Sequence, residues 1–524
     1  MGSMARVLVT EELAEAGLER LRAAGHDVDV RLGLTVEELN AEVVGAQALI
    51  IRSATRVTQE VVAAGTELVV VGRAGIGLDN VDVDAATRRG VMVVNAPQSN
   101  IVSAAEHTMA LLLAQARNVP QAHSALVAGR WERGRWEGVE LADKTLGIVG
   151  LGRIGKLVAD RARAFGMRLV AFDPFVSAER ARQLGVELLP LDQVVAESDF
   201  LTIHLPKTAE TAGLIGRDLL VKAKPTLRVI NVARGGIVDE AALADCIREN
   251  VIAGAALDVF DTEPTTESPL FGLPTVVVTP HLGASTREAQ DKAGETIADM
   301  VQLALAGEFV PFAVNLAAAE AHENLRPFLP LAERLGRLFG SLVAKLPPRV
   351  EISVEGDIGA YDTRIVGLAV LKGLFGRVSD EPVTFVNAPE RARASGIEVR
   401  EVSSTHSADY VNLISVSGGG HALSGTLTGR RGEQRIVLID GHTFDVPPAD
   451  HMLMVTNDDR PGVIGTVGTV LGDAGVNIAD MDVGRAEGTG TAVMLIAPTS
   501  IVPPAVVGAL RAAPGIISVA ALTA

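Results

Sequence analysis

The architecture of this 524-residue chain follows from one segment, Thr145-Leu146-Gly147-Ile148-Val149-Gly150-Leu151-Gly152-Arg153-Ile154-Gly155. An apolar run ends at Gly150 and a segment with helical spacing of apolar residues begins at Ile154, which predicts a strand, a tight turn and a helix. Gly150 permits the turn, Gly152 lets a pyrophosphate approach the backbone, and Gly155 lets the helix pack on the strand. The free amides at the helix start, from Arg153 onward, would face the phosphates. By itself the glycine pattern could be a structural turn, but the predicted strand before it and the predicted helix after it favour dinucleotide binding.

A second predicted strand, Arg168 to Phe172, runs directly into Asp173. An acidic residue roughly 20 residues after the first glycine is placed to accept hydrogen bonds from a ribose 2′-OH. The same carboxylate would repel a 2′-phosphate, so the predicted cofactor is NAD rather than NADP.

Composition excludes several classes of function. The net charge is −17, from 64 acidic and 47 basic residues, which disfavours nucleic acid and anionic membranes as partners. An anionic substrate must therefore meet a local cluster of arginine or lysine. The single cysteine, Cys246, excludes an internal disulfide framework, and no apolar run of about 18 residues or secretory signal is present. We expect a cytoplasmic protein of three or four domains, with Cys246 on the buried face of a helix.

The first hundred residues alternate short β-branched runs with helical segments, which predicts a parallel sheet covered by helices on both faces. The predicted strands are Arg6 to Thr10, Asp27 to Val30, Ala48 to Ile51, Leu68 to Gly72 and Val91 to Asn95. Polar or glycine-rich loops follow three of these strands, at the end of the sheet where such folds bind ligands. These loops carry Arg52 and Ser53, Arg73 and Gly75, and Ser99 and Asn100. Two arginines and several backbone amides could converge on one anionic ligand; the alternative is that both arginines are solvated loop charges.

A second alternating region follows the glycine segment, with strands predicted at Asp199 to His204, Arg228 to Asn231, Gly254 to Leu257 and Thr275 to Thr279. Arg234, Asp258, Glu263 and His281 lie in the loops that follow these strands. Oxidising a secondary alcohol requires a base for the hydroxyl proton, and histidine suits neutral pH. A carboxylate would orient the imidazole and stabilise its protonated form, and arginine would hold an α-carboxylate. Each residue alone could be structural, but together they predict a hydroxy-acid oxidation site.

Two features between these regions have open interpretations. The segment from Ile101 to Arg117 is predicted to be an interdomain helix, whose His107 is a packed or capping residue rather than a catalytic one. The segment Trp131-Glu132-Arg133-Gly134-Arg135-Trp136 is either an interface arm or a surface loop.

The region from Arg6 to Leu316 resembles the D-isomer-specific 2-hydroxyacid dehydrogenases. The motifs that carry the resemblance are Gly150-x-Gly-x-x-Gly with Asp173, Asn231-x-Ala-Arg234-Gly, Asp258-Val-Phe-x-x-Glu263-Pro, and Pro280-His281-Leu-Gly-Ala-Ser-Thr286. The resemblance implies that His281 is the acid–base residue, Glu263 its carboxylate partner and Arg234 the clamp for the substrate carboxylate. It implies cofactor contacts from Gly150, Gly152, Arg153, Ile154, Gly155, Asp173, Pro206, Thr208, Ala233, Asp258 and Gly283.

Within this family, the loops with Arg52, Arg73 and Asn100 are similar to those of members that oxidise 3-phosphoglycerate, the first step of serine biosynthesis. That similarity implies that Arg52, Ser53, Arg73, Gly75 and Asn100 bind substrate, with the arginines on its phosphate. It also implies a homo-oligomer, dimer or tetramer, in which Arg133 reaches the neighbouring subunit's site. The alternatives are a dehydrogenase for another small 2-hydroxy acid, such as glycerate or glyoxylate, and a NAD-sensing binding protein.

The C-terminal third is predicted to form two further domains without a catalytic constellation. Residues 317–447 are predicted to form an α+β module after an alanine-rich linker over 311–323. The histidines of this module lack metal-ligand spacing, so no metal site is predicted. Arg435 is a candidate for binding a phosphate or substrate effector. Residues 448–524 have a β-α-β-β-α-β order, a ferredoxin-like unit that resembles an ACT domain. In that resemblance Asp459 and Asn477 would hold a serine effector, although Asn457 and Asp458 depart from the related pattern. The remaining predicted domains are a substrate-binding domain, 4–100 with 286–316, and a Rossmann-type NAD-binding domain, 101–285.

Overall fold

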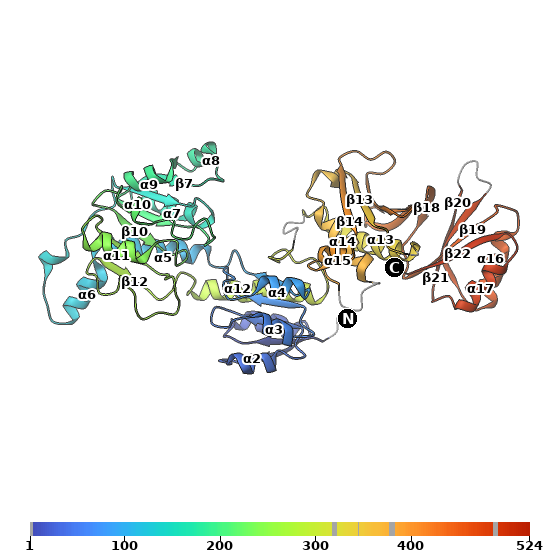
Figure 1. The fold of residues 1–524 in the computed structure, drawn as a ribbon, viewed down its shortest axis with the longest axis horizontal. Helices are drawn as coiled ribbons and strands as arrows, with labels where there is room; N and C mark the ends of the chain where they lie inside the picture. Colours follow the sequence, from blue (N-terminus) through green and yellow to red (C-terminus); the bar gives the residue numbers. More distant parts are fainter. Residues whose placement is uncertain (1–3, 317–321, 344, 377–382, 486–490, 524) are drawn as a thin grey trace.

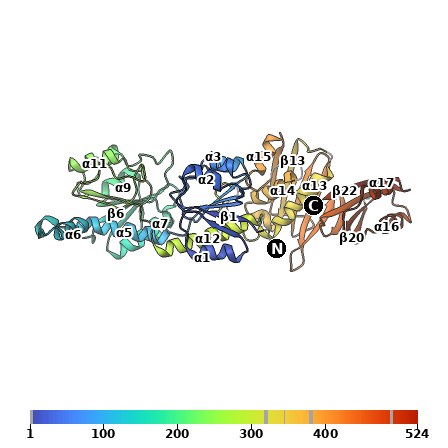
Figure 2. The same cartoon turned by 90° about the horizontal axis from the view of Figure 1, so that it is seen from below.

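In the computed structural model, four β-sheets follow one another along the long axis of the molecule (Figures 1 and 2). The structure describes residues 4–316, 322–343, 345–376, 383–485 and 491–523. Two sheets are parallel, the third is mixed and the fourth is antiparallel, which confirms the predicted fold class. Below, each sheet with its helices is called a domain.

The first domain contains a parallel sheet in the order β2-β1-β3-β4-β5. Alternate side chains of each strand face opposite sides. Val7, Ile50 and Val94 pack toward α1 and α12, whereas Leu8 and Leu49 pack toward α2, α3 and α4. The elements are β1 (Arg6–Val9), α1 (Glu15–Ala23), β2 (Asp27–Val30), α2 (Val36–Glu42), β3 (Ala48–Ile51), α3 (Gln59–Ala64), β4 (Val70–Arg73), α4 (Val83–Arg88), β5 (Met92–Asn95) and α12 (Arg287–Leu305).

The second domain contains a parallel sheet in the order β12-β11-β10-β9-β6-β7-β8. The chain adds strands first on one side of β6 and then on the other, so a crevice opens at the carboxyl end of β6, where the glycine segment lies. Cys246 is buried on α11, as predicted. The elements are α5 (Ile101–Arg117), β6 (Thr145–Val149), α7 (Arg153–Ala164), β7 (Arg168–Phe172), α8 (Ala178–Gln183), β8 (Glu187–Leu188), α9 (Leu191–Glu197), β9 (Phe200–Ile203), α10 (Arg217–Leu220), β10 (Arg228–Asn231), α11 (Glu240–Arg248), β11 (Gly254–Leu257) and β12 (Val276–Val278).

Two helices connect the first and second domains. The chain leaves the first domain along α5 and returns to it along α12, and the bounds of α5 are those predicted. The hydroxyl oxygens of Ser103, on α5, and Thr286, directly before α12, lie 2.7 Å apart. The two connecting helices are therefore linked beside the crevice between the two sheets.

A projection extends from the far end of the second domain (Figure 2). It consists of α6 (Val119–Val127) and the 3-10 helix η1 (Arg133–Trp136), which lies in the segment predicted to be either an interface arm or a surface loop. Val127 is 75% exposed and Trp131 is 82% exposed, so the projection carries apolar surface into solvent.

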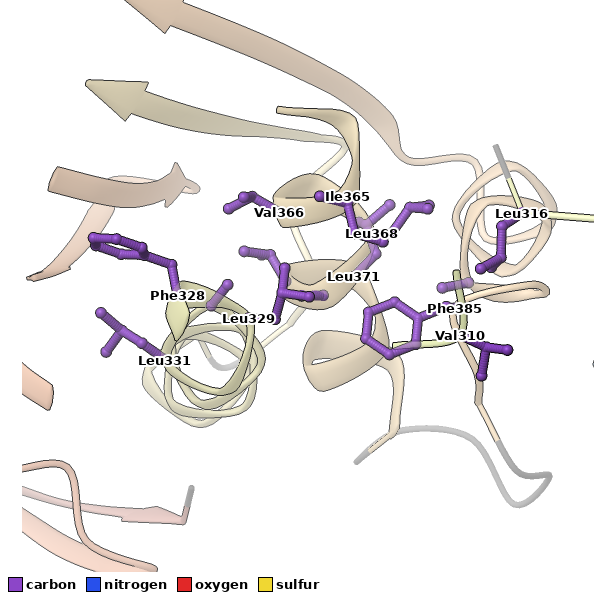
Figure 3. Packing of buried hydrophobic residues seen from close by; sticks show 14 of the residues in the cluster. Val310, Leu316, Phe328, Leu329, Leu331, Ile365, Val366, Leu368, Leu371 and Phe385 are labelled. Atoms are coloured by element: carbon purple, nitrogen blue, oxygen red, sulfur yellow. The ribbon is translucent and has the colours of Figure 1, made fainter. Parts of the chain in front are cut away.

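The third domain shares one continuous core with the first. Figure 3 shows Val310 and Leu316, which follow α12, beside Phe385 on one side of α14, with α13 on the other side of α14; all belong to one core cluster. The two helices approach closely, because a Cβ on Gly336 or Gly373 would lie 2.0 Å from a carbonyl oxygen of the other helix. The elements are η2 (Arg326–Phe328), α13 (Leu329–Leu342), β13 (Arg349–Gly356), η3 (Asp357–Ala360), α14 (Arg364–Gly376), α15 (Ala388–Ala394), β14 (Glu398–Ser404), β15 (Asn412–Gly418), β16 (His421–Thr428), β17 (Glu433–Ile439) and β18 (His442–Val446). The predicted linker lies partly outside the described residues.

The fourth domain has the predicted β-α-β-β-α-β order in a sheet ordered β20-β21-β19-β22. Its elements are β19 (His451–Asn457), α16 (Val463–Asp473), β20 (Ile478–Arg485), β21 (Ala492–Pro498), α17 (Pro504–Ala512) and β22 (Ile516–Thr523). No helix within the described ranges of the whole chain has both the length and the apolar character that a membrane crossing requires.

Candidate active site

A cavity of about 560 Å³ lies between the first and second domains, at the carboxyl ends of their strands. Its lining includes Arg52, Arg73 and Asn100 from the first domain and Glu263 and His281 from the second. The structure therefore brings together side chains that the sequence placed on separate loops. No group of described side chains in the chain has the composition and spacing to hold a metal ion.

His281 and Glu263 form a close pair, with His281 Nδ1 2.6 Å from Glu263 Oε2. The other carboxylate oxygen, Oε1, accepts the backbone N–H of Phe260 at 2.9 Å. Burial raises the pKa of Glu263, but the hydrogen bonds from His281 and Phe260 outweigh burial and leave this pKa lowered. The ionised carboxylate holds the proton of His281 on Nδ1, so Nε2 is the ring atom available to a substrate hydroxyl.

Asp258 fixes the turn that carries His281. Its fully buried carboxylate accepts hydrogen bonds from the hydroxyl of Thr279 at 2.6 Å and from the backbone amides of Leu282 and Gly283 at 2.7 and 2.8 Å. His107 Nε2 lies 3.2 Å from the same carboxylate and 3.0 Å from the hydroxyl of Thr279, so His107 belongs to the hydrogen-bond network around Asp258. Burial raises the pKa of Asp258, but the hydrogen bonds from His107, Thr279 and Leu282 outweigh it and lower this pKa. The predicted contact of Asp258 with nicotinamide stays a prediction.

Arg234 lies on the second domain but pairs with the first. Its Nε is 3.5 Å from Asp79 Oδ2, and its Nη1 donates to the carbonyl of Ala233 at 2.8 Å. Asn231 fixes the loop, because its side chain donates to the carbonyl of Arg234 and accepts the amide of Ala233. A Cβ on Gly77 would lie 2.4 Å from Arg234 Nη2, so a larger residue there would displace the end of the arginine side chain where it reaches the other domain.

No ion pair joins Arg73 to a carboxylate in the described part of the chain, although the charges of Asp79 and Glu11 act on it. Its buried Nε has no hydrogen-bond partner among the described residues, and Asn100 Oδ1 is likewise unpartnered. Burial, followed by the charge of Arg234, lowers the pKa of Arg73. Gly75 makes room for the guanidinium, because a Cβ there would lie 1.7 Å from Arg73 Nη1. The group retains its charge, so the arrangement favours an anion beside Arg73.

The loop after β3 corrects one expectation. The sequence predicted that several backbone amides there could bind a ligand, but the amides of Arg52, Ala54 and Thr55 donate to the carboxylate of Glu11. Glu11 lies at the end of β1, which is the neighbour of β3 in the sheet. An acidic residue directly after the first strand was the available signal, but its meaning depended on that strand order.

The glycine segment fits a dinucleotide. Gly150 has a φ of 98°, and a Cβ on Gly155 would lie 2.2 Å from the carbonyl of Gly150, so both are required by the turn itself. Gly152 differs, because a Cβ there would meet open space, which leaves room for a phosphate at the start of α7. Asp173 accepts the amides of Leu151 and Phe175, which ties the end of β7 to the turn.

The other predicted cofactor residues have simple positions. Pro206 and Thr208 are exposed after β9, Ile154 and Ala233 are half-buried, and the amide of Gly283 is bound by Asp258. Arg153 Nη1 lies 3.4 Å from the carbonyl of Pro97, across the domain boundary. Their contacts with a cofactor stay predictions.

Ser53 lines the cavity, and Glu11 does not accept its amide, unlike those of Arg52, Ala54 and Thr55. Three predicted residues lie away from the cavity. Arg133 is on the projection. Asp459 and Asn477 flank α16 at its two ends, and the strands beside them pair with opposite ends of β21. One chain therefore does not bring Asp459 and Asn477 together.

Three family models match the chain. They are described as "D-isomer specific 2-hydroxyacid dehydrogenase, NAD binding domain" over residues 109–283, "D-3-phosphoglycerate dehydrogenase intervening domain" over 324–440, and "ACT domain" over 451–515. The second and third correspond to the mixed and antiparallel sheets.

Curated relatives are similar along almost the whole chain. The D-3-phosphoglycerate dehydrogenase of Mycobacterium tuberculosis is 49% identical over 501 residues, covering 94% of both chains. That of Methanocaldococcus jannaschii is 40% identical over 524 residues, covering 99% of this chain and 100% of the relative. That of Bacillus subtilis is 40% identical over 521 residues, covering 98% and 99%.

Solved structures are similar over about three fifths of the chain. The TT0316 protein from Thermus thermophilus has a TM-score of 0.55 at 37% identity, covering 59% of this chain and 99% of that chain. A glyoxylate reductase from Paecilomyes thermophila has a TM-score of 0.54 at 28% identity, covering 60% and 99%.

Proposed function

The chain belongs to the D-3-phosphoglycerate dehydrogenases, and from this premise we propose that it oxidises D-3-phosphoglycerate with NAD to 3-phosphohydroxypyruvate, the first step of serine biosynthesis. The observation that carries the proposal is the meeting of the His281–Glu263 pair with Arg73 and Arg52 at one cavity. The pair supports hydroxyl oxidation, and the arginines support a phosphorylated substrate.

The residues divide the chemistry as follows. His281 Nε2 removes the hydroxyl proton, and the ionised Glu263 stabilises the imidazolium that forms. Arg234 binds the substrate carboxylate through guanidinium donors that Ala233 does not use, which orients the carbon that is oxidised. Gly152 and the start of α7 would hold NAD, which would supply the hydride acceptor.

Arg73 and Arg52 are proposed to hold the substrate phosphate, with Ser53 and Asn100 beside them. The unpartnered Nε of Arg73 supports this role, because a half-buried cation gains most from an anion that completes its hydrogen bonds. Arg52 donates from Nη1 to the carbonyl of Glu12 at 3.3 Å, a long bond that a phosphate can replace.

Replacing Arg73 with glutamine tests the substrate. We expect wild-type protein to form NADH from 3-phosphoglycerate, followed by absorbance. The variant should raise KM roughly 10- to 100-fold, equivalent to the loss of about 1.5–3 kcal/mol from a charged hydrogen bond. KM for D-glycerate, which lacks the phosphate, should change far less. Arg56→Gln, an exposed arginine outside the cavity lining, is the matched control.

Other outcomes assign the alternatives. Turnover of glycerate or glyoxylate without turnover of 3-phosphoglycerate would identify a dehydrogenase for another small 2-hydroxy acid. NAD binding without turnover of any of them would identify a sensor.

The fourth domain is proposed to bind serine between two copies of the chain. Support comes from the separation of Asp459 and Asn477 within one chain, which a second copy can overcome by placing one residue opposite the other. The exposed apolar side chains of α6 and Trp131 also support a homo-oligomer, in which Arg133 reaches the partner's cavity. The proposed location is the cytoplasm, where a chain with one free cysteine is typical.

Replacing Asp459 with alanine tests the effector. We expect serine to inhibit the wild-type enzyme and the variant to need at least roughly fivefold more serine for half-inhibition, because an effector coupling is typically 1–3 kcal/mol. Serine titration of NADH formation, run beside size-exclusion mass, measures both effector response and oligomer. Asp473→Ala, an exposed acid at the other end of α16, should respond like wild type. An equal response of Asp459→Ala would contradict the assignment.

A further inference from the structure

One carboxylate binds the backbone amides of the loop from Arg52 to Thr55. Glu11 Oε1 accepts the amides of Arg52 and Thr55, both at 2.8 Å, and Glu11 Oε2 accepts the amide of Ala54 at 3.1 Å. Three donors of one four-residue loop therefore point at a single side chain. Such an arrangement fixes the loop conformation, because each donor would otherwise need water or another acceptor.

The carbonyl groups of the same loop are anchored from the other side. Asn80 Nδ2 donates to the carbonyls of Arg52 at 2.8 Å and of Thr55 at 2.6 Å. Asn80 follows β4 on the loop that begins with Arg73. The amide thus ties the two arginine-bearing loops together and fixes the spacing between Arg52 and Arg73.

The charge of Glu11 has an unfavourable sign for a site that binds phosphate. Burial raises the pKa of Glu11, but hydrogen bonds from Thr55, Ala54 and Arg52 outweigh it and lower this pKa, so the group is anionic at neutral pH. An anion near the substrate phosphate repels it. Positioning of the loop is the benefit that offsets this repulsion.

We propose that Glu11 is a positioning residue that shapes the Arg52–Thr55 loop around the substrate phosphate and thereby sets the preference for phosphorylated over unphosphorylated 2-hydroxy acids. The inference rests on the proposed function, because it needs the phosphate to lie at Arg52 and Arg73. Asn80 performs the complementary task on the carbonyl side of the loop.

Glu11→Gln separates positioning from charge. Glutamine keeps the size of the side chain but turns one acceptor into an NH₂ donor that faces the loop amides. We expect KM for 3-phosphoglycerate to rise at least tenfold, and the ratio of kcat/KM for 3-phosphoglycerate to that for D-glycerate to fall at least tenfold. If Glu11 acted only through its charge, glutamine would instead lower KM, because the repulsion is gone. Glu19→Gln, an exposed acid on α1, removes the same charge elsewhere and should leave the ratio unchanged.

Asn80→Asp is the second variant, in case the first folds poorly. It turns the donor of two hydrogen bonds into an acceptor that faces two carbonyls, and the same fall in the ratio is expected. Amide hydrogen exchange of residues 52–55 gives a readout without catalysis, and exchange should be faster in Glu11→Gln than in Glu19→Gln.

The outcomes separate the two proposals. Wild-type turnover of 3-phosphoglycerate with an unchanged ratio in Glu11→Gln overturns the role of Glu11 alone. Equal losses on both substrates also overturn it, because they indicate a general structural role. A wild-type enzyme that does not oxidise 3-phosphoglycerate overturns the proposed function, and the inference with it.

Discussion

Replacing His281 with asparagine is expected to lower kcat for 3-phosphoglycerate oxidation by roughly 1,000-fold, within the range that a general base contributes. Asparagine lacks an atom that can take the hydroxyl proton at neutral pH, although it can still hydrogen-bond to Glu263. NAD binding should be retained, because the glycine segment and Asp173 do not contact His281 through any hydrogen bond described above. Steady-state NADH formation and a separate NAD titration measure the two properties.

His406→Asn is the matched control, since His406 is an exposed histidine that follows β14 in the third domain. Glu263→Gln should give a smaller loss of kcat, because glutamine still orients the ring but no longer stabilises the imidazolium. Retention of wild-type kcat by His281→Asn would remove the histidine from the mechanism and require another base.

Replacing Asp258 with alanine is expected to lower the free energy of unfolding by about 3–5 kcal/mol, because it leaves several buried donors without an acceptor. The amides of Leu282 and Gly283, the hydroxyl of Thr279 and the ring of His107 all lose their shared acceptor. The turn with His281, whose φ of 56° is unusual for a residue with a side chain, loses its main constraint.

A shift of the urea transition to lower concentration measures this loss. Asp245→Ala is the control, because Asp245 is half exposed and pairs with Arg248 on the surface, where such pairs contribute about 1 kcal/mol or less. A transition unchanged in Asp258→Ala would show that water satisfies these groups.

The effect of Asp258 should depend on pH. The pKa of Asp258 is lower in the folded than in the unfolded chain, so its stabilising contribution is complete well above the ordinary value of 3.8. It is lost as the pH falls through 3.8 toward the folded-state pKa. The difference in stability between wild type and Asp258→Ala should therefore narrow over that acidic range.

The sequence predicted best the elements in which apolar residues are regularly spaced and polar or glycine residues mark both ends. The helix α5 begins and ends where expected, because apolar spacing and flanking asparagines mark it. The helix α14 was missed because it is apolar on almost every side and contains Gly367 and Gly373, so it has no amphipathic pattern. Strands β16 and β18 were missed among glycine-rich turns.

The candidate site likewise contains residues that the sequence could predict and residues that it could not. Side chains at strand ends, such as Arg73 and His281, could be predicted because parallel strands present their carboxyl ends at one edge. The groups that position the Arg52 loop and Arg234 could not be predicted, because Glu11, Asn80 and Asp79 act across neighbouring strands or domains. Their contacts depend on the strand order and on the closeness of the two domains, which local patterns do not encode.

The continuous core between the first and third domains limits how a minimal catalyst can be made from this chain. A fragment that ends at residue 316 keeps both parallel sheets, but it loses the third-domain side chains that cover Val310 and Leu316 (Figure 3). That newly bare apolar surface favours aggregation. Trimming the protein to its catalytic half therefore calls for polar replacements on this face, made together with the cut.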